Sequence, residues 1–260
     1  MTSYSKFYNT ITFTKVNGIS TWSKINGLTP TNWAEIYTYT TNATATTITN
    51  WIGAAISTSA IVPNIINGKQ VAITASSTFN VKTTLTNCYI EQNATFLGNS
   101  MDHAFNGCSN LKSINFIPPT VSQMYLAFAY CGNLETIPTT LPSGVTNMRS
   151  SFFGVSKIVN FPNIPNGVTT MYSTFGGCSN MINAPTISSS ATNMSETFRD
   201  CVKLQGNITI INTSVVGFTN CFRGCNASLP KTLRCPTGSA SYNLAINVCN
   251  GKNGVTVVAY

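Results

Sequence analysis

The sequence predicts a β-rich solenoid, a right-handed stack of about six coils, and three spacings in it carry this prediction. A methionine recurs every 23 or 24 residues between positions 101 and 194. A phenylalanine follows each of these methionines after four positions, and an apolar residue, usually cysteine, follows after another three. One such unit cannot bury its apolar face alone, so consecutive units must stack around a shared core.

The repeat is a set of aligned columns, each with one kind of side chain. The methionine column holds Met101, Met124, Met148, Met171, Met194 and Phe218. The phenylalanine column holds Phe105, Phe128, Phe152, Phe175, Phe198 and Phe222. The cysteine column holds Cys108, Cys131, Val155, Cys178, Cys201 and Cys225. A further apolar column holds Leu111, Leu134, Ile158, Met181 and Leu204. These columns are predicted to face the core.

Each unit also predicts its own local structure. Positions 0, 4 and 7 of a unit would share one face of a short α- or 3₁₀-helical segment. The stretches LETIP (134–138) and IVNFP (158–162) alternate apolar and polar residues and end at proline, as a short strand does. Turns such as PSGVTN and PNGVTT then return the chain. We therefore expect one short parallel strand per coil.

The segment MYLAFAYCGNLETIPTTLPSGVTNM (124–148) resembles the BspA-like class of leucine-rich repeats and the related Met-x-x-x-Phe-x-x-Cys repeats of mollicute surface proteins. The resemblance covers about 101–228. Proteins of that family are surface adhesion and interaction modules, so the resemblance implies a non-enzymatic role and a structural use of the columns. Val155, Phe218 and the loss of proline after residue 185 depart from the pattern.

The two ends of the chain lie outside the main register. Residues 1–75 contain strand-like stretches separated by Asn-Gly pairs at 17–18, 26–27 and 67–68, and predict a β-rich region that anchors or oligomerises the protein. A degenerate coil around Phe79 and Leu85 would start the solenoid, which we place at 76–228. Residues 229–260 end in a β-rich run that we expect to cap the open sheet edge.

The nine cysteines allow a buried ladder, disulfides or a metal site. Equivalent cysteines in adjacent coils lie about 5 Å apart, but in-register side chains point the same way and reach the disulfide dihedral with difficulty. Free cysteine is also among the most buried residue types, which favours the ladder. Cys221, Cys225, Cys235 and Cys249 fit no zinc spacing, and the repeat explains the first two. A disulfide between Cys235 and Cys249 stays open.

Other catalytic constellations are weak. His103 is the single histidine, and neighbouring Asp102 would point away from it. Glu196 and Asp200 are four residues apart, but Asp200 lies in a variable column, which argues against a glycosidase pair. No phosphate-binding loop or dinucleotide fingerprint is present. We expect no catalytic residue, no cofactor and no metal.

The charged residues indicate which kinds of partner the protein could bind. Charged residues make up only 8% of the chain, and the net charge of +8 comes from singly scattered basic residues, which argues against nucleic acid. No stretch is apolar enough for membrane insertion. Arg199 and Arg223 share the position after the phenylalanine, and Lys157 and Lys203 share the position two after the cysteine slot. Stacking would align these four as a basic stripe, either solvated surface or a contact for an acidic protein or glycan.

Together these features predict a non-enzymatic interaction module. The few charges, the Thr- and Asn-rich composition and the lack of an apolar signal segment favour a bacteriophage virion surface component, a fibre or decoration protein that binds a receptor. Its partners would be a surface protein or glycan, other virion proteins or further copies of itself. A secreted or cell-surface adhesin of a bacterium or protist is the alternative, and both place the protein on a virion or an extracellular surface.

Overall fold

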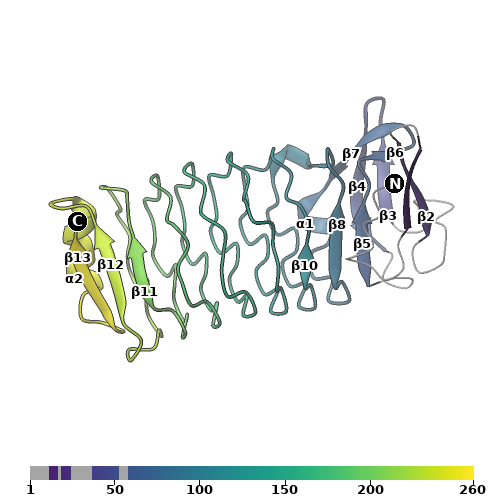
Figure 1. The fold of residues 1–260 in the computed structure, drawn as a ribbon. Coiled ribbons are helices and arrows are strands. Elements are labelled where there is room, and N and C mark those ends of the chain that lie inside the picture. Colours follow the sequence, from purple (N-terminus) through teal and green to yellow (C-terminus); the bar gives the residue numbers. More distant parts are fainter. Residues whose placement is uncertain (1–11, 17–18, 25–36, 53–57) are drawn as a thin grey trace.

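The computed structural model is an elongated β-solenoid of about eight turns, with the N-terminal strands at one end and the C-terminal strands at the other (Figure 1). It describes residues 12–16, 19–24, 37–52 and 58–260. The turns outnumber the six that the sequence predicts, because strands before Met101 and after Phe222 continue the stacking.

The N-terminal part is β-rich, as predicted. The antiparallel hairpin of β1 (Thr12–Val16) and β2 (Ile19–Lys24) precedes a mixed sheet of β3 (Tyr37–Thr41), β4 (Ala45–Trp51), β7 (Lys69–Ile73) and β6 (Ile65–Ile66). The Asn-Gly turn at 67–68 joins β6 to β7, with both residues at positive φ. The Asn-Gly pairs at 17–18 and 26–27 lie outside the described residues.

Two parallel three-stranded sheets form part of the solenoid, one toward each end. The first contains β5 (Ser59–Val62), β8 (Asn87–Ile90) and β10 (Ser113–Ile114). The second contains β11 (Gly206–Thr209), β12 (Lys231–Cys235) and β13 (Val255–Ala259). Shorter elements complete the fold: α1 (Ala75–Thr78), β9 (Thr95–Phe96) beside β7, η3 (Leu97–Asn99) and α2 (Ala240–Val248) near the C-terminus.

The predicted columns form one continuous core, and their side chains are almost entirely buried. Successive rings of the phenylalanine column stack nearly parallel, with centroids 5.2–5.9 Å apart and interplanar angles of at most 13°. Phe79 stacks on Phe105 and Leu85 is buried, so the degenerate first coil is confirmed. A ring spacing close to the 4.8 Å strand spacing lets each phenylalanine lie on the next.

The segments between the methionine and cysteine slots are turns, so the helical prediction is wrong. The residues two after the methionine slot all have positive φ: His103, Leu126, Ser150, Ser173, Glu196 and Asn220. So do those six after it: Gly107, Tyr130, Gly154, Gly177, Asp200 and Gly224. Left-handed residues at alternate corners prevent the i to i−4 hydrogen bonds of a helix.

Backbone groups freed by this geometry pair between coils. The N–H groups of Met148, Ser150, Phe152 and Gly154 donate to four carbonyls of the next coil, at 2.7–3.1 Å. The same four positions donate in the coils that begin at residues 101, 124, 171 and 194. We call the stacked segments 101–107, 124–130, 148–154, 171–177, 194–200 and 218–224 the turn ladder.

The expected strand per coil is absent from the middle coils. Residues 134–138 and 158–162 form no strand, and Thr136 makes only an isolated bridge to Ser113. Pro138, Pro162 and Pro185 occupy one repeat position there, and proline has no N–H to donate to a ladder. Parallel pairing in these coils is instead a single bridge at the residue before each methionine slot.

Candidate interaction surface

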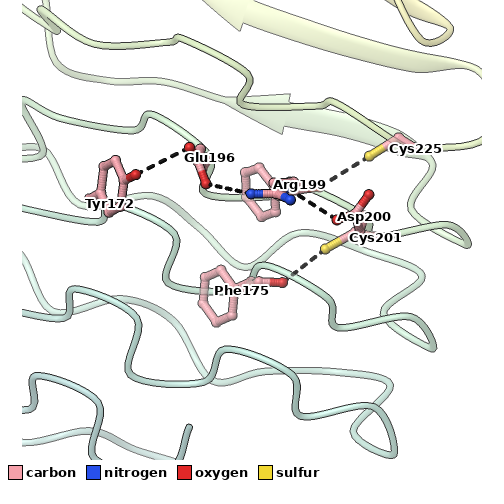
Figure 2. A network of polar contacts seen from close by, with 8 residues as sticks. Tyr172, Phe175, Glu196, Arg199, Asp200, Cys201 and Cys225 are labelled. Carbon is pink, nitrogen blue, oxygen red and sulfur yellow. Dashed lines mark hydrogen bonds and ion pairs between the residues drawn. The ribbon is translucent and has the colours of Figure 1, made fainter. Parts of the chain in front are cut away.

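The cysteine column is an inward-facing ladder, as predicted. Each of its five thiols donates to the carbonyl of the phenylalanine in the preceding coil, at Sγ···O distances of 2.9–3.2 Å. Figure 2 shows two of these bonds, from Cys201 and Cys225. Burial raises the pKa of Cys108 to about 12 and that of Cys225 to about 11. A thiol that stays protonated and hydrogen-bonded is a poor nucleophile, so the column is structural.

The remaining candidate sites for chemistry do not assemble. All nine cysteines are free and buried, Cys221, Cys235 and Cys249 among them. His103 packs edge-on against the Tyr125 ring, 5.1 Å between centroids, while Asp102 accepts a hydrogen bond from the Tyr125 backbone N–H at 2.8 Å. Within the described ranges, no three His, Cys, Asp or Glu residues are grouped to hold a metal, and no helix is long and apolar enough to cross a membrane.

The four predicted basic residues have different surroundings. Arg199 is held in two ion pairs, to Glu196 at 3.1 Å and to Asp200 at 3.2 Å. The Nζ of Lys203 donates to Asn180 Oδ1 at 2.7 Å. Lys157 and Arg223 are exposed. Two of the four cations therefore already have partners: Arg199 is bound by acidic side chains and Lys203 by an amide side chain.

Glu196 and Asp200 hold Arg199 instead of facing each other as a catalytic pair. Glu196 accepts from the Tyr172 hydroxyl through Oε1, at 3.1 Å, and from Arg199 through Oε2 (Figure 2). The hydrogen bond to Glu196 raises the pKa of Tyr172. The result is a chain of contacts from Tyr172 to Asp200 that fixes long side chains of two neighbouring coils.

A second group of residues combines aromatic side chains with Arg149, an arginine that the sequence did not single out. The guanidinium carbon of Arg149 lies 5.6 Å from the centroid of the Tyr125 ring and 5.0 Å from that of Tyr172, so the cation is held between rings of the coils on either side. Nearby, Tyr130 meets Phe153 edge-on at 5.4 Å. The sequence did carry a signal, because Tyr125, Arg149 and Tyr172 all follow the methionine slot.

These residues define one feature, which we call the turn-ladder surface: Tyr125, Arg149, Phe153, Tyr172, Glu196 and Arg199. Its side chains alternate in type from coil to coil, whereas the inward columns repeat. The cation–π contacts and ion pairs restrain side chains that are otherwise flexible. The surface has the composition of a binding site, with aromatic rings and arginines fixed on a rigid backbone.

Comparisons with known proteins agree with the repeat architecture. The family profile described as the BspA type leucine rich repeat region matches residues 2–135 and 102–228, in six copies. Among solved structures, a leucine-rich repeat protein of T. pallidum is 16% identical, with a TM-score of 0.38 over 78% of this chain and 84% of that one. One from Bacteroides ovatus is also 16% identical, with a TM-score of 0.44 over 86% and 75%. No curated protein matches the chain.

Proposed function

Because the chain belongs to the BspA-type leucine-rich repeat family, we propose that it is a non-enzymatic module that binds a macromolecular partner through the turn-ladder surface. The observation that carries the proposal is the Tyr125–Arg149–Tyr172 sandwich, which fixes an exposed arginine between two rings. Tyrosine and arginine are enriched among the residues that dominate binding energy at protein interfaces.

Rigidity supports the same proposal. Each residue of the surface stands on a turn whose N–H groups are bonded to the next coil. Ordering a flexible side chain on binding costs about 0.5–1.5 kcal/mol, and much of that cost is already met where a side chain is held before the partner arrives. Lys157 and Arg223, at the neighbouring edge, would add attraction for acidic groups of a surface protein or glycan.

A comparison of matched variants tests the binding role. The purified protein is labelled, and its saturable binding to intact bacterial cells and to purified virus particles is measured for the wild type, R149A and Y172A. Lys112→Ala is the control, because Lys112 is an exposed cation beside β10, away from the turn ladder. We expect about tenfold weaker binding for R149A and Y172A and no change for K112A. Equal binding by all four proteins contradicts the proposal.

The finer assignment is to a bacteriophage virion, as a fibre or decoration protein that contacts other virion proteins or copies of itself. Its support is compositional: a surface poor in charge and rich in Thr and Asn. Co-sedimentation of the native protein with purified particles tests this assignment. Detection on washed cells that carry no virus favours the alternative, a secreted or cell-surface adhesin.

A further inference from the structure

The hydrogen-bond pattern of the turn ladder stops at its last coil. In the coils that begin at residues 101, 124, 148, 171 and 194, four alternate N–H groups donate to the next coil. The corresponding groups of the last coil belong to Phe218, Asn220, Phe222 and Gly224, and none of them donates to any described residue. Phe218 and Phe222 are only 1% and 3% exposed, so an unpaired N–H is costly there, whereas Asn220 and Gly224 are exposed residues.

A cavity lies in front of this row of donors. It has a volume of about 240 Å³ and is lined by residues 218–223 and by four residues at and just after the end of α2: Val248, Cys249, Lys252 and Asn253. Phe218, Phe222, Cys221 and Cys249 give it an apolar floor. We call it the terminal cavity.

The left-handed turn at Asn220 gives the donors around it the geometry of an anion site. Asn220 has φ of +54° and Gly224 of +76°, and the three residues between them do not have positive φ. Where a left-handed residue is followed by a right-handed one, the N–H groups on either side point toward one concavity and bind anions. In all five earlier coils, the equivalent N–H groups donate to carbonyl oxygens of the next coil, so the same backbone positions bind oxygen acceptors there.

Two cations line the same cavity. Arg223 is exposed, and its guanidinium group has no hydrogen-bond or ion-pair partner in the described part of the chain. Lys252 donates from Nζ to the carbonyl of Val248 at the end of α2, at 3.0 Å. Burial raises the pKa of Cys249 to about 12, and the positive charge of Lys252 opposes that rise.

Acidic side chains do not compete for these groups. After Asp200 the sequence contains five basic residues, Lys203, Arg223, Lys231, Arg234 and Lys252, and no acid. Asp200 itself lies one coil before, beside Gly224, and its Oδ2 accepts from Arg199 Nε at 3.2 Å. The C-terminal end of the solenoid is therefore a region of positive potential.

We propose that the terminal cavity binds a small oxyanion, such as phosphate or sulfate, between the N–H groups of Phe218, Asn220 and Phe222 and the side chains of Arg223 and Lys252. The ligand is free or is the terminal group of a larger molecule. A second peptide coil is the other way to pair four donors in a row, but Val248, Cys249, Lys252 and Asn253 already line the cavity opposite the donors. The cations also favour a charged oxygen over a neutral carbonyl.

Calorimetric titration with sodium phosphate, sodium sulfate and sodium acetate, at constant ionic strength, tests the site on the full chain. We expect saturable binding of phosphate and sulfate, and about tenfold weaker binding by R223Q/K252Q. K157Q/K203Q is the matched control, because it removes the same charge from exposed positions outside the cavity, and it should bind like the wild type. Acetate binding as tight as phosphate would also support the site and would identify a carboxylate as its ligand group.

A measurement on the wild type keeps the proposal falsifiable if R223Q/K252Q does not fold. In an amide nitrogen–proton correlation spectrum, phosphate should shift the signals of Phe218, Asn220 and Phe222 more than those of Phe152 and Phe175, whose N–H groups are already bonded. Absence of saturable binding, equal affinity in R223Q/K252Q, or amide shifts that follow protein concentration instead of anion concentration would each overturn the proposal. The last result would mean that a second copy of the chain pairs with the donors.

Discussion

Replacing Phe152 by alanine removes a core side chain that contacts three other aromatic rings. Its ring stacks on Phe128 at 5.5 Å and on Phe175 at 5.9 Å, and it meets the edge of Phe161 at 5.1 Å. Phe222, at the C-terminal end of the same column, stacks only on Phe198, at 5.7 Å. Comparing the two truncations separates ring contacts from simple burial.

The expected magnitudes follow from these contacts. Truncating a buried phenylalanine to alanine costs about 3–5 kcal/mol of unfolding free energy. Each aromatic pair contributes about 0.5–1.5 kcal/mol beyond its buried area, and Phe152 has two pairs more than Phe222. Phe152→Ala should therefore exceed Phe222→Ala by about 1–3 kcal/mol.

Urea unfolding followed by far-ultraviolet circular dichroism measures both variants against the wild type. Phe152→Leu is the control, because it keeps most of the apolar volume and loses the ring. We expect it to fall between Phe152→Ala and the wild type. An alanine cavity in a middle coil should also broaden the transition, since each coil is stabilised by its neighbours alone. If Phe152→Ala and Phe222→Ala lose the same free energy, the stacked column adds nothing beyond burial and the reasoning is refuted.

Three further predictions concern the columns and the turns. Burial raises the pKa of all nine cysteines, so the folded chain keeps protons that the unfolded chain releases above about pH 8.5. The free energy of unfolding should therefore be constant below that pH and fall above it, by up to about 1.4 kcal/mol per pH unit for each thiol. A free energy from urea unfolding that stays constant up to about pH 10 would contradict this prediction. Cys178→Val should cost less than about 1.5 kcal/mol by urea unfolding, because Val155 already fills this column; a loss as large as that of a truncated phenylalanine rules out the purely structural ladder. Gly176→Ala should cost about 1–3 kcal/mol, because its Cβ would lie 2.8 Å from Phe153 Cδ2 and 2.9 Å from Ser173 Oγ. Phe153→Ala in the same chain should remove part of that loss, and fully additive losses would show that the ring is not an obstacle.

The core of the fold was predictable because its buried positions recur at a regular spacing in the sequence. Spacings of 23 and 24 residues located the phenylalanine and cysteine columns, and the six-residue offset from Phe79 to Leu85, the same as from Phe105 to Leu111, located the first coil. The helical prediction failed because positions 0, 4 and 7 share a face in a helix and in this chain of turns. The sign of φ carried no clear signal, since Leu126 and Glu196 occupy left-handed positions that usually select glycine or asparagine.

The contacts of the exposed side chains were harder to predict, because a repeat column indicates which residues are adjacent but not which partner each side chain binds. Arg199 and Arg223 are equivalent by register, yet Arg199 is held by two acids whereas Arg223 lines the terminal cavity. Arg149 was missed because its partners are aromatic rings of other coils and not neighbouring charges. The Arg149 contacts span 24 and 23 residues, which only the stacking register reveals, whereas the Arg199 ion pairs are local to one coil.

The end of a repeat array poses a problem that its interior does not. Inside the turn ladder, carbonyl groups of each coil accept hydrogen bonds from the N–H groups of the coil before it. The N–H groups of the last coil therefore need another acceptor. The chain beyond it supplies α2 and β13, which pack on the apolar core, but it supplies no acceptor for the last row of N–H groups. A purely structural cap would be expected to provide both. The mismatch, placed where the charge is uniformly positive, is why the C-terminal end warrants a functional test separate from that of the turn-ladder surface.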